Sequence, residues 1–96
     1  MIASTIPNRT RQIRRRELEQ FRQSIESWAR QGQEAVRDGD VELAAGYAED
    51  VAYLRAILRL IETGALHEAA EAIDRLDTLV QDQIPIHLYD AVVLRS

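Results

Sequence analysis

The stretch that most constrains the fold is Val41–Glu62 (VELAAGYAEDVAYLRAILRLIE), which contains no proline and is the most densely apolar part of the chain. On a helical period of 3.6 residues its large side chains share one face: Leu43, Tyr47, Val51, Leu54, Leu58 and Ile61. A second seam, on an adjoining side, consists only of Ala45, Ala48, Ala52 and Ala56. A helix with two apolar sides needs a neighbour on each, so we predict that this segment is the central helix of a bundle.

The preceding segment carries its own helical pattern. Apolar or small residues recur at steps of three and four: Leu18, Phe21, Ile25, Trp28, Gly32 and Ala35. This spacing predicts one amphipathic helix up to Asp38, capped by Asn8 or Thr10, whose basic first turns are exposed. Gly32 on the apolar stripe indicates a close helix contact. Asp38-Gly39-Asp40 then reads as a helix stop followed by a helix cap, and so short a connection predicts two antiparallel neighbours.

The second half of the chain predicts two further helices. A third helix, over residues 65–83, follows the glycine stop at Gly64 and places Leu66, Ile73, Leu76 and Val80 on its apolar face. It ends before Pro85, because the residue ahead of a proline is disfavoured in the α region. Pro85 is well placed to begin a short fourth helix, in which Ile86, Tyr89, Val92 and Val93 are available for packing.

These patterns predict an all-α fold: a small antiparallel helical bundle of three main helices plus a short C-terminal helix. We expect residues 1–9 to form an extended basic arm and residues 10–96 a single domain. The predicted core consists of Leu18, Phe21, Ile25, Trp28, Leu43, Tyr47, Val51, Leu54, Leu58, Ile61, Leu66, Ile73, Leu76 and Val80.

Composition narrows the class of protein. A chain of 96 residues builds only a modest core, which makes association of two copies plausible. The chain has no cysteine, so thiolate chemistry is excluded, and no apolar run approaches the roughly 20 residues that span a bilayer. We therefore expect a cytoplasmic protein without membrane contact. All 12 basic residues are arginine, a bias typical of GC-rich bacterial or phage genomes.

Charge is distributed unevenly along the chain. Residues 1–16 carry five arginines and no acid, whereas the remainder carries seven arginines and 16 acidic residues. The basic segment, with Arg9, Arg11, Arg14, Arg15 and Arg16, could contact phosphates or an acidic protein. No aromatic side chain is interleaved for base stacking, which favours a protein partner or no partner over nucleic acid. The acidic surface of the predicted third helix, with Glu68, Glu71 and Asp74, could bind a basic partner.

Signals for catalysis are weak. His67, Glu71 and Asp74 share a helix face, but the chain lacks the two-histidine and Glu-x-x-His motifs of zinc and di-iron sites. Asp77 falls at the edge of an apolar stripe, a position that favours a structural pairing with Arg55 or Arg59 over acid–base catalysis. We expect no cofactor, no metal and no enzymatic activity.

Two functional hypotheses follow. The first is a protein-interaction module that binds stoichiometrically as an adaptor, inhibitor or assembly factor, with a homodimer possible through the alanine seam or an exposed part of the first helix. The second is a small nucleic-acid-binding or regulatory protein that uses the arginine arm.

Overall fold

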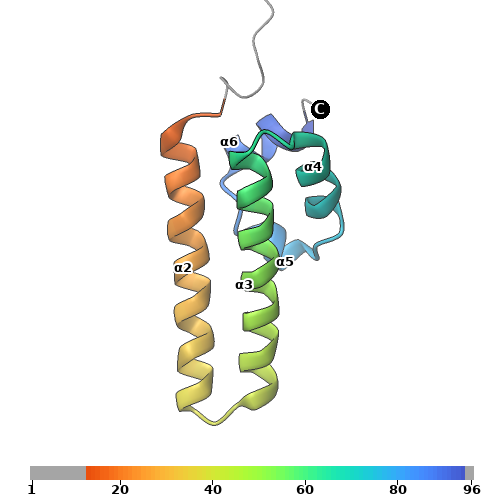
Figure 1. Ribbon diagram of the computed structural model, residues 1–96. Helices are drawn as coiled ribbons and strands as arrows, with labels where there is room; N and C mark the ends of the chain where they lie inside the picture. The colour runs from red at the N-terminus through yellow and green to blue at the C-terminus, as the bar shows by residue number, and fades with distance from the viewer. Residues whose placement is uncertain (1–12, 95–96) are drawn as a thin grey trace, which may run out of the picture.

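The computed structural model describes residues 13–94, and its described part contains helices and turns but no strand. Two long helices, α2 (Arg15–Arg37) and α3 (Val41–Glu62), run side by side in opposite directions (Figure 1). The prediction of an all-α protein is therefore confirmed.

The loop between α2 and α3 is built as its sequence indicates. Gly39 has a φ of +78°, a conformation that glycine adopts without steric cost. The side chain of Asp40 accepts a hydrogen bond from the backbone N–H of Leu43 at 3.1 Å and so caps α3. These two residues reverse the chain within three positions and set α2 against α3.

The first helix begins later than the sequence pattern suggests. It starts at Arg15 with Arg14 as its cap residue, and the Arg14 backbone N–H donates to the Glu17 carboxylate at 3.4 Å. Asn8 and Thr10, the predicted caps, lie outside the described residues, as does the predicted arm at residues 1–9. The Glu at the third helical position is the local signal that marks this start.

The C-terminal elements pack against only one half of the hairpin. Helices α4 (Leu66–Asp74), α5 (Thr78–Gln81), α6 (Ile86–Tyr89) and the π-helix η2 (Asp90–Leu94) lie beside the half of α3 that is far from the loop (Figure 1). Ser24 of α2 donates to the Gln83 carbonyl at 2.6 Å and ties the hairpin to this region. Among residues 13–94, α2 and α3 have only each other as neighbours near the loop (Figure 1).

This one-sided packing changes the predicted core. Leu43, in the first turn of α3, is 49% exposed because the C-terminal elements do not reach it, so its assignment to the core was wrong. Ile57 was not predicted and is 1% exposed, because the buried side of α3 turns toward α4 in its second half. Five predicted core residues are only partly buried: Leu18, Trp28, Tyr47, Leu58 and Leu76. The fully buried cluster contains the other eight: Phe21, Ile25, Val51, Leu54, Ile61, Leu66, Ile73 and Val80.

The predicted continuous third helix is wrong. The chain leaves the helix after Asp74, and Asp77 adopts an extended conformation from which its side chain accepts the Val80 N–H at 3.1 Å. Asp77 is thus the cap of α5 and has no ion pair with Arg55 or Arg59. The Gln81 side-chain amide donates to the backbone carbonyls of Ile73 and Leu76, at 2.9 and 3.2 Å. It thereby bonds carbonyl groups that have no helical partner because the helix ends after Asp74.

The last predicted helix begins where expected, and most of its predicted packing residues are found at the core, with Ile86 as the exception. Pro85 is the cap residue of α6. Leu88 and Val92 are fully buried in the core together with Ile84, whereas Ile86 is exposed. Tyr89 and Val93 are partly buried against this core. The C-terminal segment is therefore an integral part of the core.

Candidate docking surface

The most unusual surface of the described chain is the side of α3 that faces away from the core. Ala45, Ala48, Ala52 and Ala56 recur along this side and all four are exposed. They share the helix face of Val41, which is 77% exposed at the start of α3. We call these five residues the alanine face. Within residues 13–94 no helix covers it, so of the two neighbours that the sequence left open for this side, a helix of the same chain is not found there.

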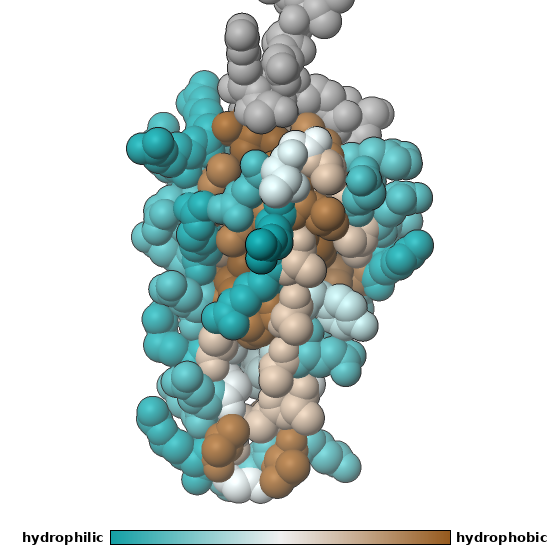
Figure 2. All heavy atoms as spheres, in the orientation of Figure 1, coloured by the Kyte–Doolittle hydropathy of each residue, from teal (hydrophilic) through white to brown (hydrophobic). Residues whose placement is uncertain are grey.

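The alanine face continues into a shallow groove between the two long helices. The groove has a volume of about 290 Å³ and is lined from α2 by Ala29, Gly32 and Val36 and from α3 by Ala44, Ala48 and Val51, among others. Val36 is 66% exposed and extends the apolar surface toward the loop. Figure 2 shows a pale, weakly hydrophobic strip that runs down the molecule along α3 between hydrophilic flanks and ends in strongly hydrophobic side chains.

Charged groups lie at the two ends of this surface and at one edge of its middle, where the exposed Glu49 follows Ala48. Glu42 lies in the first turn of α3, and Arg55 and Arg59 lie toward its C-terminal end. Arg55 lines the groove, and Glu62 lies two turns further along on the same side of α3. Because Glu62 is paired with Arg22, the surface is acidic at the N-terminal end of α3 and at Glu49, and basic at Arg55 and Arg59.

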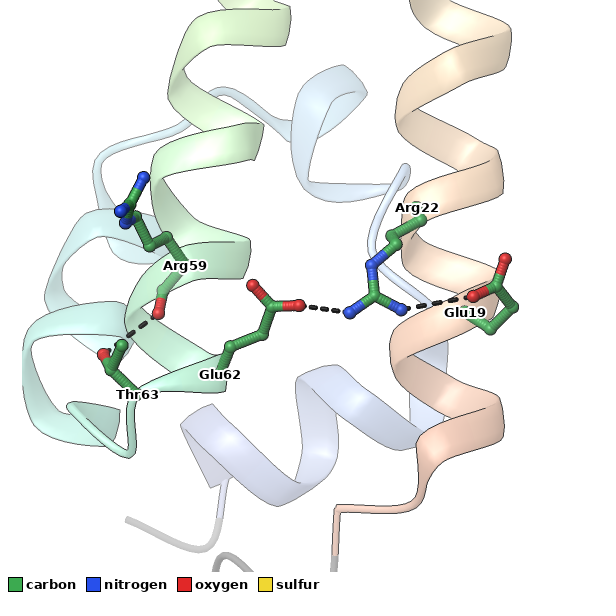
Figure 3. Close-up of polar contacts among 5 residues, drawn as sticks. All are labelled: Glu19, Arg22, Arg59, Glu62 and Thr63. Atoms are coloured by element: carbon green, nitrogen blue, oxygen red, sulfur yellow. Dashed lines mark hydrogen bonds and ion pairs between the residues drawn. The ribbon is translucent and has the colours of Figure 1, made fainter.

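An ion pair joins the two long helices beyond the groove. Arg22 of α2 pairs with Glu62 of α3 and also with Glu19, one turn before it, at 3.2 Å (Figure 3). Hydrogen bonding to the Glu62 carboxylate raises the pKa of the Arg22 guanidinium above its ordinary value. In the same view Thr63 donates to the Arg59 carbonyl at 3.0 Å and closes the end of α3. This end of the hairpin is thus fixed by polar contacts.

A second hollow lies between α3 and the α4–α5 region. Its volume is about 440 Å³, and it is lined by Glu49, Asp50 and Tyr53 on one side and by Arg75, Leu76 and Asp77 on the other, among others. Both charge signs occur in it, and Asp77 is already engaged as a helix cap. Its mixed charges and the engaged Asp77 make it a weaker candidate than the alanine face.

The predicted partner-binding residues fall into two separate groups. Arg14, Arg15 and Arg16 are exposed at the start of α2, whereas Glu68, Glu71 and Asp74 are exposed on α4. Among the described residues no ion pair joins the two groups. Arg9 and Arg11 lie outside the described residues.

The three side chains considered above as metal ligands, His67, Glu71 and Asp74, do not form a metal site within residues 13–94. His67 Nε2 lies 3.8 Å from Glu71 Oε1 on the exposed surface of α4. Asp74 does not join them, and no group of three or more possible ligands occurs in the described chain. This contact is an ordinary i,i+4 surface pair.

No protein-family model, curated protein or solved structure matches the chain, so functional arguments depend on its own residues. Within the described range no helix is long and apolar enough to cross a membrane. The sequence did point to the alanines as a contact surface. It did not show that they are exposed, because helical periodicity locates an apolar side but does not say which neighbour covers it.

Proposed function

We propose that this protein is a non-enzymatic protein-interaction module that acts by stoichiometric binding, and that the alanine face and its groove are the docking surface. The observation that carries the proposal is an exposed row of small apolar residues on α3 that extends from Val41 to Ala56, with charged residues only at its edges. Solvent-facing sides of helices normally carry charged or polar residues, and contiguous exposed apolar surface on a small protein commonly marks an interaction site.

The shape of the surface supports a helical partner. Alanine side chains end at Cβ, so a partner helix can approach α3 to an interaxial distance of about 8 Å. At this distance Val36 and Val41 would also be covered, and burial of a valine contributes about 1.5 kcal/mol or more. The docking surface therefore favours a helix with small residues over a loop or an extended strand.

A matched set of substitutions tests the proposal. Ala52→Arg places a long charged side chain in the middle of the alanine face, and Leu79→Arg makes the same charge change at another exposed apolar position. We expect a polypeptide in near-equal molar amount to co-purify with the tagged wild type and with Leu79→Arg from cells that naturally make the chain, and to be lost with Ala52→Arg. Equal recovery with Ala52→Arg, or no stoichiometric polypeptide with the wild type, would contradict the proposal.

A nucleic-acid role is the second candidate, and the observation that favours it is the exposure of Arg14, Arg15 and Arg16 on consecutive positions at the start of α2. Such a cluster can contact phosphates, with binding that weakens as salt rises. Titration with duplex DNA at low and moderate salt tests it. Binding that disappears in the triple alanine variant supports this role, and no binding at low salt excludes it.

A further inference from the structure

The docking surface has features that identify its occupant. The alanines alone fit any helix of small residues, but the charges at the two ends of α3 are more selective. Glu42 lies at one end, with Asp38 and Asp40 in the adjoining loop, and Arg55 and Arg59 lie toward the other. A partner helix that complements this surface must be small where it meets the alanines, basic opposite Glu42 and acidic opposite Arg59.

The α3 helix of another copy of this chain meets that description when it runs in the opposite direction. We propose that the alanine face is covered by the alanine face of a second copy, with the two α3 helices antiparallel about a two-fold axis. This inference rests on the proposed function and names the partner at the same surface. A parallel arrangement would place acidic end on acidic end and basic end on basic end, which is unfavourable.

The length of the alanine face sets the register of the two α3 helices. The two helices cover each other's alanines fully only when the midpoint between Ala45 and Ala56 lies on the two-fold axis. Ala45 of one copy then lies opposite Ala56 of the other. In the same register Glu42 comes level with Arg59 of the second copy, once at each end of the interface. Such a self-complementary arrangement is the usual form of a two-fold dimer.

The surrounding surface is compatible with this contact. The groove beside α3, with Ala29, Gly32 and Val36 of α2, lies on the side of the hairpin that the C-terminal elements leave free. Two hairpins joined through α3 would therefore form a four-helix arrangement without disturbing the core. Each copy would cover the exposed Val41 of the other, near the point where its own α3 ends.

Because the chain contains no cysteine, single introduced cysteines report this register directly. We expect Ala45→Cys mixed with Ala56→Cys to form a disulfide-linked dimer under mild oxidation. Each variant alone should give little cross-linking, because its two copies of the cysteine are about 16 Å apart along the axis, beyond the roughly 7 Å that a disulfide spans. Leu79→Cys serves as the exposed control. The Ala52→Arg change, added to both partners, should abolish the mixed cross-link while the helical circular dichroism is retained.

Efficient cross-linking of each single variant with itself would overturn the antiparallel register. Absence of any cross-link in the mixture, with both variants helical and the wild type monomeric in sedimentation, would overturn self-association. If self-association fails while Ala52→Arg still removes another stoichiometric partner, the proposed function stands and only the identity of the occupant is wrong. If Ala52→Arg removes nothing, both fail.

Discussion

Gly32 of α2 lies so close to Tyr47 of α3 that a Cβ atom at position 32 would be 2.9 Å from the Tyr47 Cβ. Around this contact the rings of Trp28 and Tyr47 meet edge to face, with centroids 5.1 Å apart. The Tyr47 hydroxyl donates to Gln31 at 3.0 Å. The two helices thus approach each other closely at Gly32, which confirms the close contact predicted from its position.

Gly32→Ala should destabilise the protein by about 1–3 kcal/mol, because the added methyl group pushes the helices apart. Gly46→Ala is the matched control, since a Cβ there meets no atom within 4 Å. Replacing that helical glycine should stabilise the protein by about 1 kcal/mol. Urea denaturation of both variants measures the difference, and a neutral or stabilising Gly32→Ala would contradict the observed packing.

Ile57→Ala and Leu43→Ala should differ strongly although both residues are large, aliphatic and on α3. Ile57 is fully buried, so its truncation should cost about 2–5 kcal/mol, whereas truncation of the half-exposed Leu43 should cost about 1 kcal/mol or less. Thermal unfolding followed by circular dichroism measures both. Equal losses would show that the first turn of α3 is covered in solution.

Asp77→Ala should cost about 1 kcal/mol, because the Val80 N–H loses the carboxylate that caps α5. Asp77→Asn should retain most of the stability, since the amide oxygen can accept the same hydrogen bond. Asp74→Ala, at an exposed position on α4, controls for the loss of a negative charge. If Asp74→Ala and Asp77→Ala have the same effect in chemical denaturation, the capping role is refuted.

Leu88→Ala should destabilise the protein by about 2–5 kcal/mol, which is a large part of the stability of so small a domain. The neighbouring Ile86→Ala, at an exposed position, should change stability by about 0.5 kcal/mol or less. Denaturant titration of the pair shows whether the C-terminal segment belongs to the core. A loss of stability in Leu88→Ala as small as that in Ile86→Ala would place the C-terminal segment outside the core.

Glu62→Gln should lower the thermal midpoint slightly at low salt and have a smaller effect at high salt, because Arg22 and Glu62 form an exposed ion pair. The raised pKa of Arg22 means that its contribution is present below the ordinary arginine pKa and is lost only as the pH rises through the raised value. The midpoint difference should therefore not change between neutral and mildly alkaline pH. Glu26→Gln is the exposed control on α2, and an equal loss there would refute the specific pair.

The sequence predicted the parts of the fold that local chemistry determines. Gly39 and Asp40 mark the turn between α2 and α3, and Pro85 marks the start of the last helical segment, because a left-handed glycine, a capping carboxylate and a fixed φ act within a few residues. The break before α5 was also encoded locally, by Asp77 followed by Thr78, but the continuing apolar pattern from Ile73 to Val80 concealed it.

Tertiary packing determined what the sequence did not predict. Leu43 and Ile57 both fit an apolar side of α3, and only the position of the C-terminal elements decides that the first is exposed and the second buried. The same holds for the alanine face. Its spacing predicts a close helix contact, but a pattern within one chain does not distinguish an internal neighbour from a second copy.

Sedimentation equilibrium of the unaltered chain, compared with Ala52→Arg over a range of concentrations, tests most directly whether two copies meet through the alanine face. We predict that the wild type reaches twice the 10.9 kDa mass of one chain as its concentration rises, while the variant keeps the single-chain mass and the same helical content. A wild type that remains at the mass of one chain at every concentration, or a variant that associates as strongly as the wild type, would contradict the account.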